Sequence, residues 1–151
     1  MIKIITVGSI KEKYLKEAIE EYKKRISKYT SLEVIELKDE GLVDPQKAIE
    51  IEAQKIEKQV NNRDYLITLE IEGKEYTSPE FAEKIRNILI ENSNITFVIG
   101  GSYGLSENIK NKANLHLSFS KMTFPHQLFR VILLEQIYRA YKINNNESYH
   151  K

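Results

Sequence analysis

The stretch that decides the fold runs from Leu117 to Tyr141 and reads LSFSKMTFPHQLFRVILLEQIYRAY. A short apolar strand is predicted to enter a compact loop over residues 118–124. Pro125 then opens a long helix, because proline fixes φ near the helical value and lacks an N–H. The loop has no glycine, whereas a mobile connector is typically polar and glycine-rich. It carries instead three apolar side chains, those of Phe119, Met122 and Phe124. We therefore predict that this loop forms a shaped pocket wall.

Outward from this stretch, apolar β-branched runs alternate with helical patterns along the whole chain. The predicted strands cover residues 2–7, 32–37, 65–69, 95–99 and 115–119. The predicted helices cover residues 15–29, 45–60, 78–89, 107–112 and 125–141. Asp44 and Ser78 each precede a proline and are predicted N-caps. The polar run Glu70–Glu75 is predicted to be a loop. This alternation predicts a single α/β domain over residues 1–151 with a mainly parallel sheet of about five strands.

In parallel sheets of this kind, ligands bind beyond the carboxyl ends of the strands. Three predicted loops qualify, after Leu69, after Ile99 and after Phe119. The second of them reads GGSYGL over residues 100–105, and its glycines permit close backbone approach or positive φ. It lacks the G-x-G-x-x-G spacing of dinucleotide sites, and no phosphate-binding P-loop motif occurs in the chain. A plain structural turn is the alternative, but its pairing with the unusual loop at 118–124 favours a ligand site.

Two side chains at the start of the last helix are candidates for chemistry. His126 sits where the helix dipole favours anionic partners, although a capping or packing role is the alternative. Arg130 lies one turn further along and could reach a phosphate. The three histidines are too scattered to predict a metal site, and no metal is expected.

The C-terminal tail is the third candidate. Tyr149, His150 and Lys151 are suited to stacking on a base and contacting phosphate rather than to core packing. A frayed end is the alternative interpretation.

Composition sets the broad class. The chain has no cysteine, which excludes disulfides and thiolate metal sites and fits a reducing cytoplasm. No apolar run approaches the roughly 20 residues of a membrane span, and the N-terminus is too short and β-branched for a signal peptide. We expect a cytoplasmic protein without membrane contact. Residues 1–99 carry a net charge of −3 and residues 100–151 of +4. Such asymmetry is typical of a phosphate-facing end, although small domains also scatter charge unevenly.

The last helix is apolar on several sides, which predicts more cover than one sheet face provides. A second copy of the chain is the natural candidate. We expect a homodimer whose interface includes Ile132, Leu134, Ile137 or Tyr138.

The segments FVIGGSYGL, LSFSKMTFPHQLFRVILLEQIYRAYKI and the closing ESYHK closely resemble the ribosomal large-subunit pseudouridine methyltransferases of the RlmH family, which are small SPOUT-class enzymes. The resemblance covers the entire chain. It implies a SPOUT-type α/β fold with a C-terminal trefoil knot, a homodimer, and S-adenosylmethionine as methyl donor. It also implies methyl transfer to N3 of a pseudouridine in 23S rRNA, in the helix 69 stem-loop, on assembled ribosomes. Carried over by position, the donor site comprises Leu69, Gly100, Phe119, Ser120, Lys121, Met122, Thr123 and Phe124.

The roles of the basic and aromatic groups stay open at this point. His126, Arg130, Tyr149, His150 and Lys151 are the candidates for RNA contact and proton handling. Family members often carry a basic residue and a glycine just before the tail motif, where this chain has Asn144-Asn145-Asn146. The competing class is a non-catalytic RNA- or ribosome-binding domain. A nucleotide hydrolase is excluded for want of a phosphate loop and an acidic metal pair.

Overall fold

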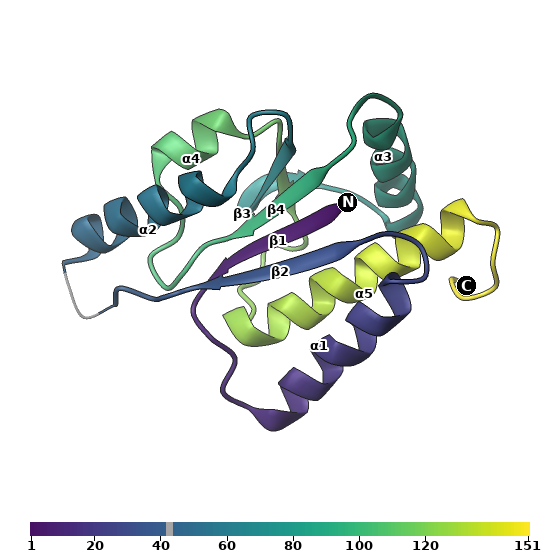
Figure 1. Cartoon of the computed structure of the whole chain (residues 1–151), viewed down its shortest axis with the longest axis horizontal. Coiled ribbons are helices and arrows are strands. Elements are labelled where there is room, and N and C mark those ends of the chain that lie inside the picture. The colour runs from purple at the N-terminus through teal and green to yellow at the C-terminus, as the bar shows by residue number, and fades with distance from the viewer. Residues whose placement is uncertain (42–43) are drawn as a thin grey trace.

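Five parallel strands form one sheet in the order β2-β1-β4-β3-β5 (Figure 1). The computed structural model describes residues 1–41 and 44–151. The strands are β1 (Ile2–Val7), β2 (Leu32–Leu37), β3 (Tyr65–Glu75), β4 (Ile95–Ile99) and β5 (Leu115–Ser118). The predicted parallel α/β architecture is confirmed. The trefoil knot that the resemblance implies stays a prediction.

The helices cover both faces of the sheet (Figure 1). Helices α1 (Lys13–Ile26), α3 (Ser78–Glu91) and α5 (His126–Asn144) lie on one face, and α2 (Pro45–Gln59) and α4 (Glu107–Lys112) on the other. This division follows from right-handed crossovers, because the chain reverses its direction across the sheet at each successive connection. Within the described ranges, no helix is long and apolar enough to cross a lipid bilayer.

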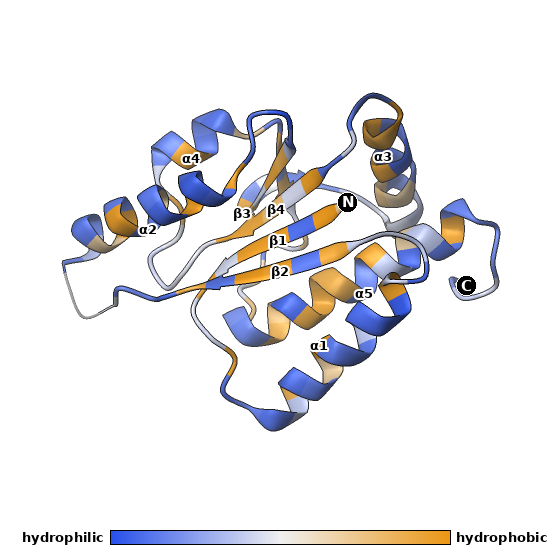
Figure 2. Ribbon diagram, in the orientation of Figure 1, coloured by the Kyte–Doolittle hydropathy of each residue, from blue (hydrophilic) through white to orange (hydrophobic). Residues whose placement is uncertain are grey.

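The core lies on both sides of the central strands, which are dominated by hydrophobic residues in Figure 2. Ile2 and Ile4 of β1 pack toward α1 and α5, and the alternate residues Ile5 and Val7 pack toward α2. All of β4 is buried, as expected of a parallel strand with both faces covered.

The helix starts follow the predicted chemistry with two shifts. The Asp44 carboxylate accepts the backbone N–H groups of Gln46 and Lys47, so this cap is confirmed. For α3 the prediction was wrong by one residue, because Thr77 rather than Ser78 is the N-cap and forms a capping box with Glu80. Helix α5 begins at His126, with Pro125 in the N-cap position.

The prediction of a loop at Glu70–Glu75 was wrong, because β3 continues through these residues. Leu117 of β5 pairs first with Leu69 and then with Lys74, so the register breaks between those two residues. The break lets β3 resume after an excursion, and Gly73 allows the close approach. A Cβ at Gly73 would lie 2.8 Å from backbone atoms of both His116 and Leu117. Because Gly73 has no side chain, the backbones of β3 and β5 approach closely enough for the polar residues Lys74 and Glu75 to pair with β5.

The apolar pattern of α5 is explained inside one chain. Leu134, Ile137 and Tyr138 are buried in the core shared with α1, α3 and the sheet. The prediction that these three side chains form a dimer interface was therefore wrong. Ile132 is only half-buried and is not affected by this correction.

The three asparagines end α5 in a regular way. Asn146 has φ of 55°, the left-handed conformation that a glycine usually supplies after a helix. Its N–H donates to Ile143 O at 3.1 Å, and the N–H of Glu147 donates to Lys142 O at 3.0 Å. These two bonds make a Schellman motif, and asparagine is the side chain that tolerates it best after glycine. The tail therefore leaves the helix in a defined direction.

Gly73→Ala tests the register break. The added methyl group must displace the β5 backbone, and we expect a loss of about 1–3 kcal/mol in the free energy of unfolding, the usual cost of overpacking. At roughly 2–4 °C per kcal/mol, thermal melting followed by circular dichroism will detect it. Glu72→Ala, at the exposed neighbouring residue, is the control and should melt like the parent. A Gly73→Ala variant with unchanged melting would contradict the close approach.

Candidate functional site

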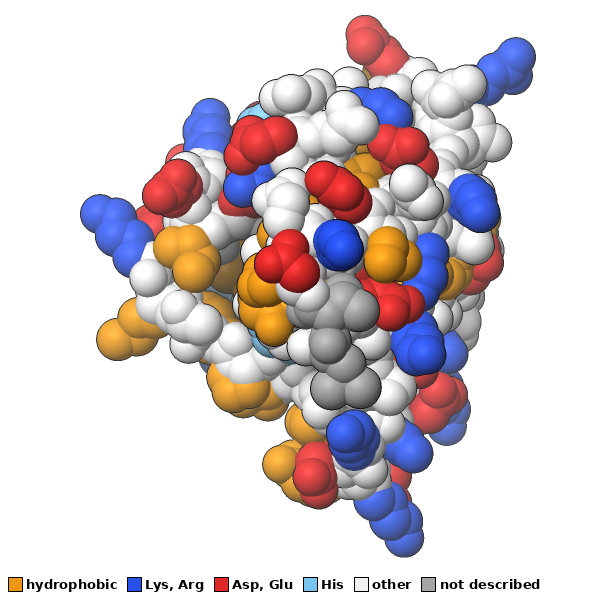
Figure 3. Space-filling model, turned by 90° about the vertical axis from the view of Figure 1, so that its left-hand side faces the viewer, with side chains coloured by type: hydrophobic (Ala, Val, Ile, Leu, Met, Phe, Trp, Pro, Cys, Tyr) orange, Lys and Arg blue, Asp and Glu red, His pale blue; other side chains and the backbone are white. Residues whose placement is uncertain are grey.

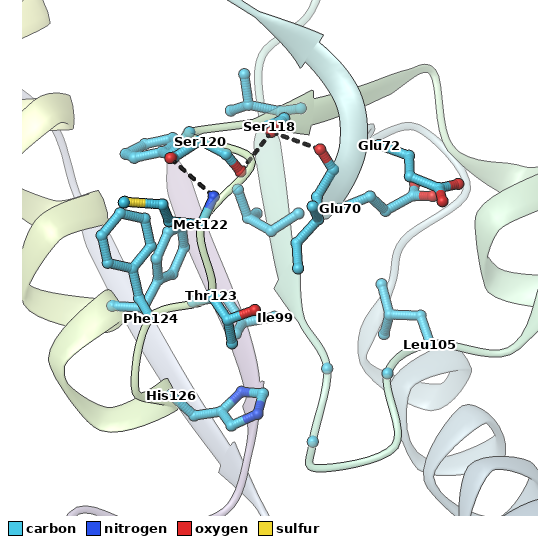
Figure 4. Close-up of a pocket in the computed structure, with 18 of the residues that line it drawn as sticks. Glu70, Glu72, Ile99, Leu105, Ser118, Ser120, Met122, Thr123, Phe124 and His126 are labelled. Atoms are coloured by element: carbon cyan, nitrogen blue, oxygen red, sulfur yellow. Dashed lines mark hydrogen bonds between the residues drawn. The ribbon is translucent and has the colours of Figure 1, made fainter.

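The three predicted segments meet in one cavity at the carboxyl edge of the sheet, although the first of them is part of β3 rather than a loop (Figure 4). Its volume of about 540 Å³ lies in the range of small-molecule sites. The walls come from β3 and from the loops after β4 and β5, and the start of α5 closes one side.

Most of the predicted donor-site residues line this cavity. They are Leu69, Gly100, Phe119, Ser120, Met122, Thr123 and Phe124. Lys121 is exposed and lies outside the set of described residues that form the walls. The structure thus brings together side chains that are separated by up to 55 positions in the sequence.

The loop after β5 is held in shape by short-range hydrogen bonds. The buried Ser118 hydroxyl shares its hydrogen between Ile71 O at 2.8 Å and Ser120 O at 3.1 Å. The Ser120 hydroxyl accepts the N–H of Met122 at 3.0 Å. Figure 4 shows these bonds as dashed lines. Ser118 therefore ties the loop to the irregular part of β3, and the loop needs no glycine.

One side of the cavity is aromatic. The ring of Phe129 on α5 lies 5.1 Å from that of Phe119 and 5.8 Å from that of Phe124, measured between centroids. Phe119 in turn meets Phe81 of the core at 6.3 Å. This chain of rings anchors the pocket wall to the interior, and it offers apolar surface to a planar ligand.

The GGSYGL loop uses its glycines in two ways. Gly104 has φ of 83°, which a residue with a Cβ adopts only under strain. Gly100 has no such φ, and it is needed because a Cβ there would lie 2.9 Å from the Gly104 backbone. Behind the loop, Glu52 of α2 is buried against Gly101, and burial raises the pKa of its carboxyl group.

The opposite side of the cavity is polar, and the sequence analysis missed it. Glu70 and Glu72 lie across the cavity from Met122 and Phe124 (Figure 4). Lys110 also lines the cavity, with its Nζ 4.0 Å from Glu70 Oε1. The sequence contains a signal for these acidic residues, because Glu70 and Glu72 come just after the apolar run of the third strand. The segment was predicted to be a solvent-exposed loop, so they were not predicted to line the site.

His126 lies at the rim of the cavity, as the first residue of α5. Within the described residues, no side chain caps this helix start, so its first N–H groups remain available. The position combines an exposed imidazole with the positive end of a helix dipole.

Arg130 lies away from the cavity, in the interior. Its guanidinium group donates to Glu36 Oε2 at 2.8 Å, to Gly8 O at 2.8 Å and to Val7 O at 3.3 Å. Burial lowers the pKa of Arg130, while the hydrogen bond to Glu36 raises it. These bonds tie α5 to the end of β1.

The tail follows the far end of α5 (Figure 1), whose first and last residues lie roughly 27 Å apart at 1.5 Å per residue. The expectation that the tail avoids core packing was wrong for Tyr149, whose ring lies 4.9 Å from that of Tyr138. Its hydroxyl donates to Glu135 at 3.1 Å, and burial, followed by the Glu135 charge, raises the pKa of Tyr149 to about 12. His150 and Lys151 are exposed.

Fold and site together define an α/β protein with a cavity of small-molecule size beyond the carboxyl ends of its parallel strands. A family described as "Predicted SPOUT methyltransferase" matches residues 1–150. The chain belongs to this SPOUT methyltransferase family, as its sequence predicted.

Full-length relatives agree with this assignment. The chain is 55% identical to a putative ribosomal RNA large subunit methyltransferase H from Methanococcus maripaludis, with 99% of both chains covered. It is 50% identical to a ribosomal RNA large subunit methyltransferase H from Streptococcus pneumoniae, again with 99% of both covered. A solved structure of a probable methylase family protein from Haemophilus influenzae shares the fold, with a TM-score of 0.58 at 16% identity. That match covers 99% of this chain and 70% of the other.

Arg130→Ala tests whether this arginine is structural. The substitution removes the charged donor to the backbone carbonyl groups of Val7 and Gly8. We therefore expect a loss of about 2–3 kcal/mol in the free energy of unfolding. Arg130→Lys should restore only part of it, because an ammonium group lacks the fork of donors. The control is Arg86→Ala on the exposed face of α3, which should stay within about 0.5 kcal/mol of the parent. If Arg130→Ala melted like the parent but lost its activity, Arg130 would instead be assigned to the active site.

Proposed function

We propose that this chain transfers a methyl group from S-adenosylmethionine to N3 of a pseudouridine in the helix 69 stem-loop of 23S rRNA. The observation that carries the proposal is the convergence of three segments on one cavity, namely part of β3 and the loops after β4 and β5, because the family resemblance assigns these segments to the donor. The names of the full-length relatives support large-subunit rRNA as the substrate.

The cavity fits the proposed donor. Adenine is planar and largely apolar on its faces, and Phe119, Met122 and Phe124 supply a matching side. Gly100 packs closely on the Gly104 backbone in the cavity wall, and peptide groups of this loop would hold the nucleoside. The polar side offers charged groups to the amino-acid part of the molecule.

When bound, S-adenosylmethionine supplies a methyl group already activated by its positive sulfonium. The task of the chain is therefore to align the target base and to exclude water. The N3–H of pseudouridine must lose its proton, and the anion that forms gains from nearby positive charge. His126 and the open N–H groups at the start of α5 lie at the cavity rim and supply such stabilisation. Arg130 is committed to Glu36 and the β1 carbonyls, so it contributes only by holding α5 in place.

We propose further that the active form is a homodimer in the cytoplasm. Residues 149–151 are not among the described residues that line the cavity of their own chain, and Tyr149 packs on Tyr138 and Glu135 instead. Next to the cavity lies a second hollow of about 270 Å³, lined largely by apolar side chains that include Phe124 and Ile132. Met122 and Leu128 are also exposed, by 74% and 41%. Figure 3 views the molecule from the cavity end, and hydrophobic side chains gather toward the left of that face.

Gly100→Val tests the donor site. The branched side chain would clash with the Gly104 backbone and alter the cavity wall, so the dissociation constant of S-adenosylmethionine should rise at least about tenfold, or about 1.4 kcal/mol. Isothermal titration calorimetry measures it, with Gly41→Val in an exposed loop as the control. A parent chain that binds no S-adenosylmethionine would favour a non-catalytic RNA-binding domain. Unchanged affinity in folded Gly100→Val would move the site elsewhere.

Deleting residues 148–151 tests the tail. We expect S-adenosylmethionine affinity to persist and methylation of intact ribosomal large subunits to be abolished. Because the deletion also removes the Tyr149 packing, the double variant His150→Ala, Lys151→Ala is needed to separate activity from stability. It should melt like the parent and still be inactive.

Mixing the tail deletion with Gly100→Val tests the composite site. A heterodimer in which the tail acts across the interface pairs one intact cavity with one intact tail, and part of the activity returns. Light scattering of the parent should give twice 17.7 kDa. A monomeric mass at micromolar concentration, or a tail deletion that methylates normally, would overturn the composite site.

A further inference from the structure

Glu70 is held in the polar wall of the cavity by a network of donors. The Thr68 hydroxyl donates to Glu70 Oε2 at 2.6 Å, and His116 Nδ1 also bonds this oxygen. Because an ionised carboxylate only accepts, His116 carries its hydrogen on Nδ1 in this pair. One carboxylate oxygen thus has two donors, and these donors fix the orientation of the other oxygen.

That second oxygen faces a cation on a different element. Lys110 Nζ of α4 lies 4.0 Å from Glu70 Oε1, at the outer limit of an ion pair, and both side chains line the cavity. Lys110 also lies 3.8 Å from Glu107 Oε1, which is largely exposed. Neither Glu70 Oε1 nor Lys110 is engaged by the other at hydrogen-bonding distance. The wall therefore presents one negative and one positive group side by side.

We propose that Glu70 and Lys110 form the subsite for the amino-acid end of the methyl donor, an inference that rests on the proposed function. The α-ammonium group would bind Glu70 Oε1, and the α-carboxylate would bind Lys110. A zwitterion matches a wall that carries both charges, whereas a ribose diol would match a carboxylate alone and leave Lys110 without a role. The aromatic wall on the opposite side receives the adenine. His116 and Thr68 act as positioning residues for Glu70.

This arrangement also orients the donor. Phe119 and Phe124 would hold the adenine, and Glu70 of β3 with Lys110 of α4 would hold the amino-acid end, so the sulfonium would lie between the two walls. His126 and the start of α5 border the same cavity, where the target base would have to approach. The subsite would thus fix the direction of transfer as well as contribute affinity.

Isothermal titration with three probes tests the subsite on the full chain. S-Adenosylmethionine and S-adenosylhomocysteine carry the amino-acid group, and 5′-methylthioadenosine retains the adenine and ribose but lacks it. Glu70→Gln and Lys110→Met should each weaken the first two at least about tenfold and change the third by less than about twofold. Lys110→Met alters the wall without touching the Thr68 and His116 network. Glu75→Gln, at an exposed acidic residue of β3 outside the cavity lining, is the charge-matched control and should leave all three affinities within about twofold.

The outcomes separate the alternatives. Equal losses for all three probes would assign Glu70 to the ribose or to the shape of the wall and overturn the subsite. Unchanged affinities, or an equal selective loss in Glu75→Gln, would overturn it as well. A parent chain that binds none of the three probes would reject the proposed function itself. Melting curves of each variant confirm that the comparison is made on folded protein.

Discussion

The double pairing of Leu117 is the constraint on which the rest of the site depends. Leu117 meets Leu69 and then Lys74 of β3, so the intervening residues leave the ladder at the carboxyl edge of the sheet. The excursion carries Glu70 into the cavity wall and brings Ile71 O to the Ser118 hydroxyl. Ser118 also bonds Ser120 O, so a single buried hydroxyl links the excursion to the loop after β5. The aromatic and the polar sides of the cavity are therefore set by one register break.

The elements of the fold were predictable because each has a strong local cause. β4 is a continuous apolar run, and Asp44 with Pro45 marks a helix start by a cap that needs no tertiary partner. The three loops of the site followed from the same pattern, since the carboxyl ends of parallel strands share an edge. The strand at Glu70–Glu75 was not predictable, because its polar residues pair only through contact with β5, 42 or more positions away.

The roles of single side chains depended on tertiary geometry that sequence patterns do not contain. Arg130 looked suited to a phosphate because it follows His126 by one turn, yet its guanidinium group reaches the carbonyl groups at the end of β1. Tyr149 looked like a free tail residue, but the Schellman turn at Asn146 directs the tail back along α5 to Tyr138. Glu70 looked like a solvated loop residue and lies in the cavity wall. In each case the deciding contact joins segments that the sequence separates.

Helix α5 connects the two halves of the proposed site and also keeps them apart. Its first turn borders the cavity, and the C-terminal tail follows its last turn at the other end of the helix. Arg130 fixes its start to β1, so the helix cannot slide to bring the tail closer without breaking buried hydrogen bonds. In a two-fold symmetric pair, antiparallel packing of α5 against α5 exchanges the two ends, because a two-fold interface places each surface opposite its own copy. In such a pair the start of one helix would lie beside the end of the other, and each tail would be brought toward the cavity of the partner. The length of α5 would then set the spacing of the site that we propose two chains share.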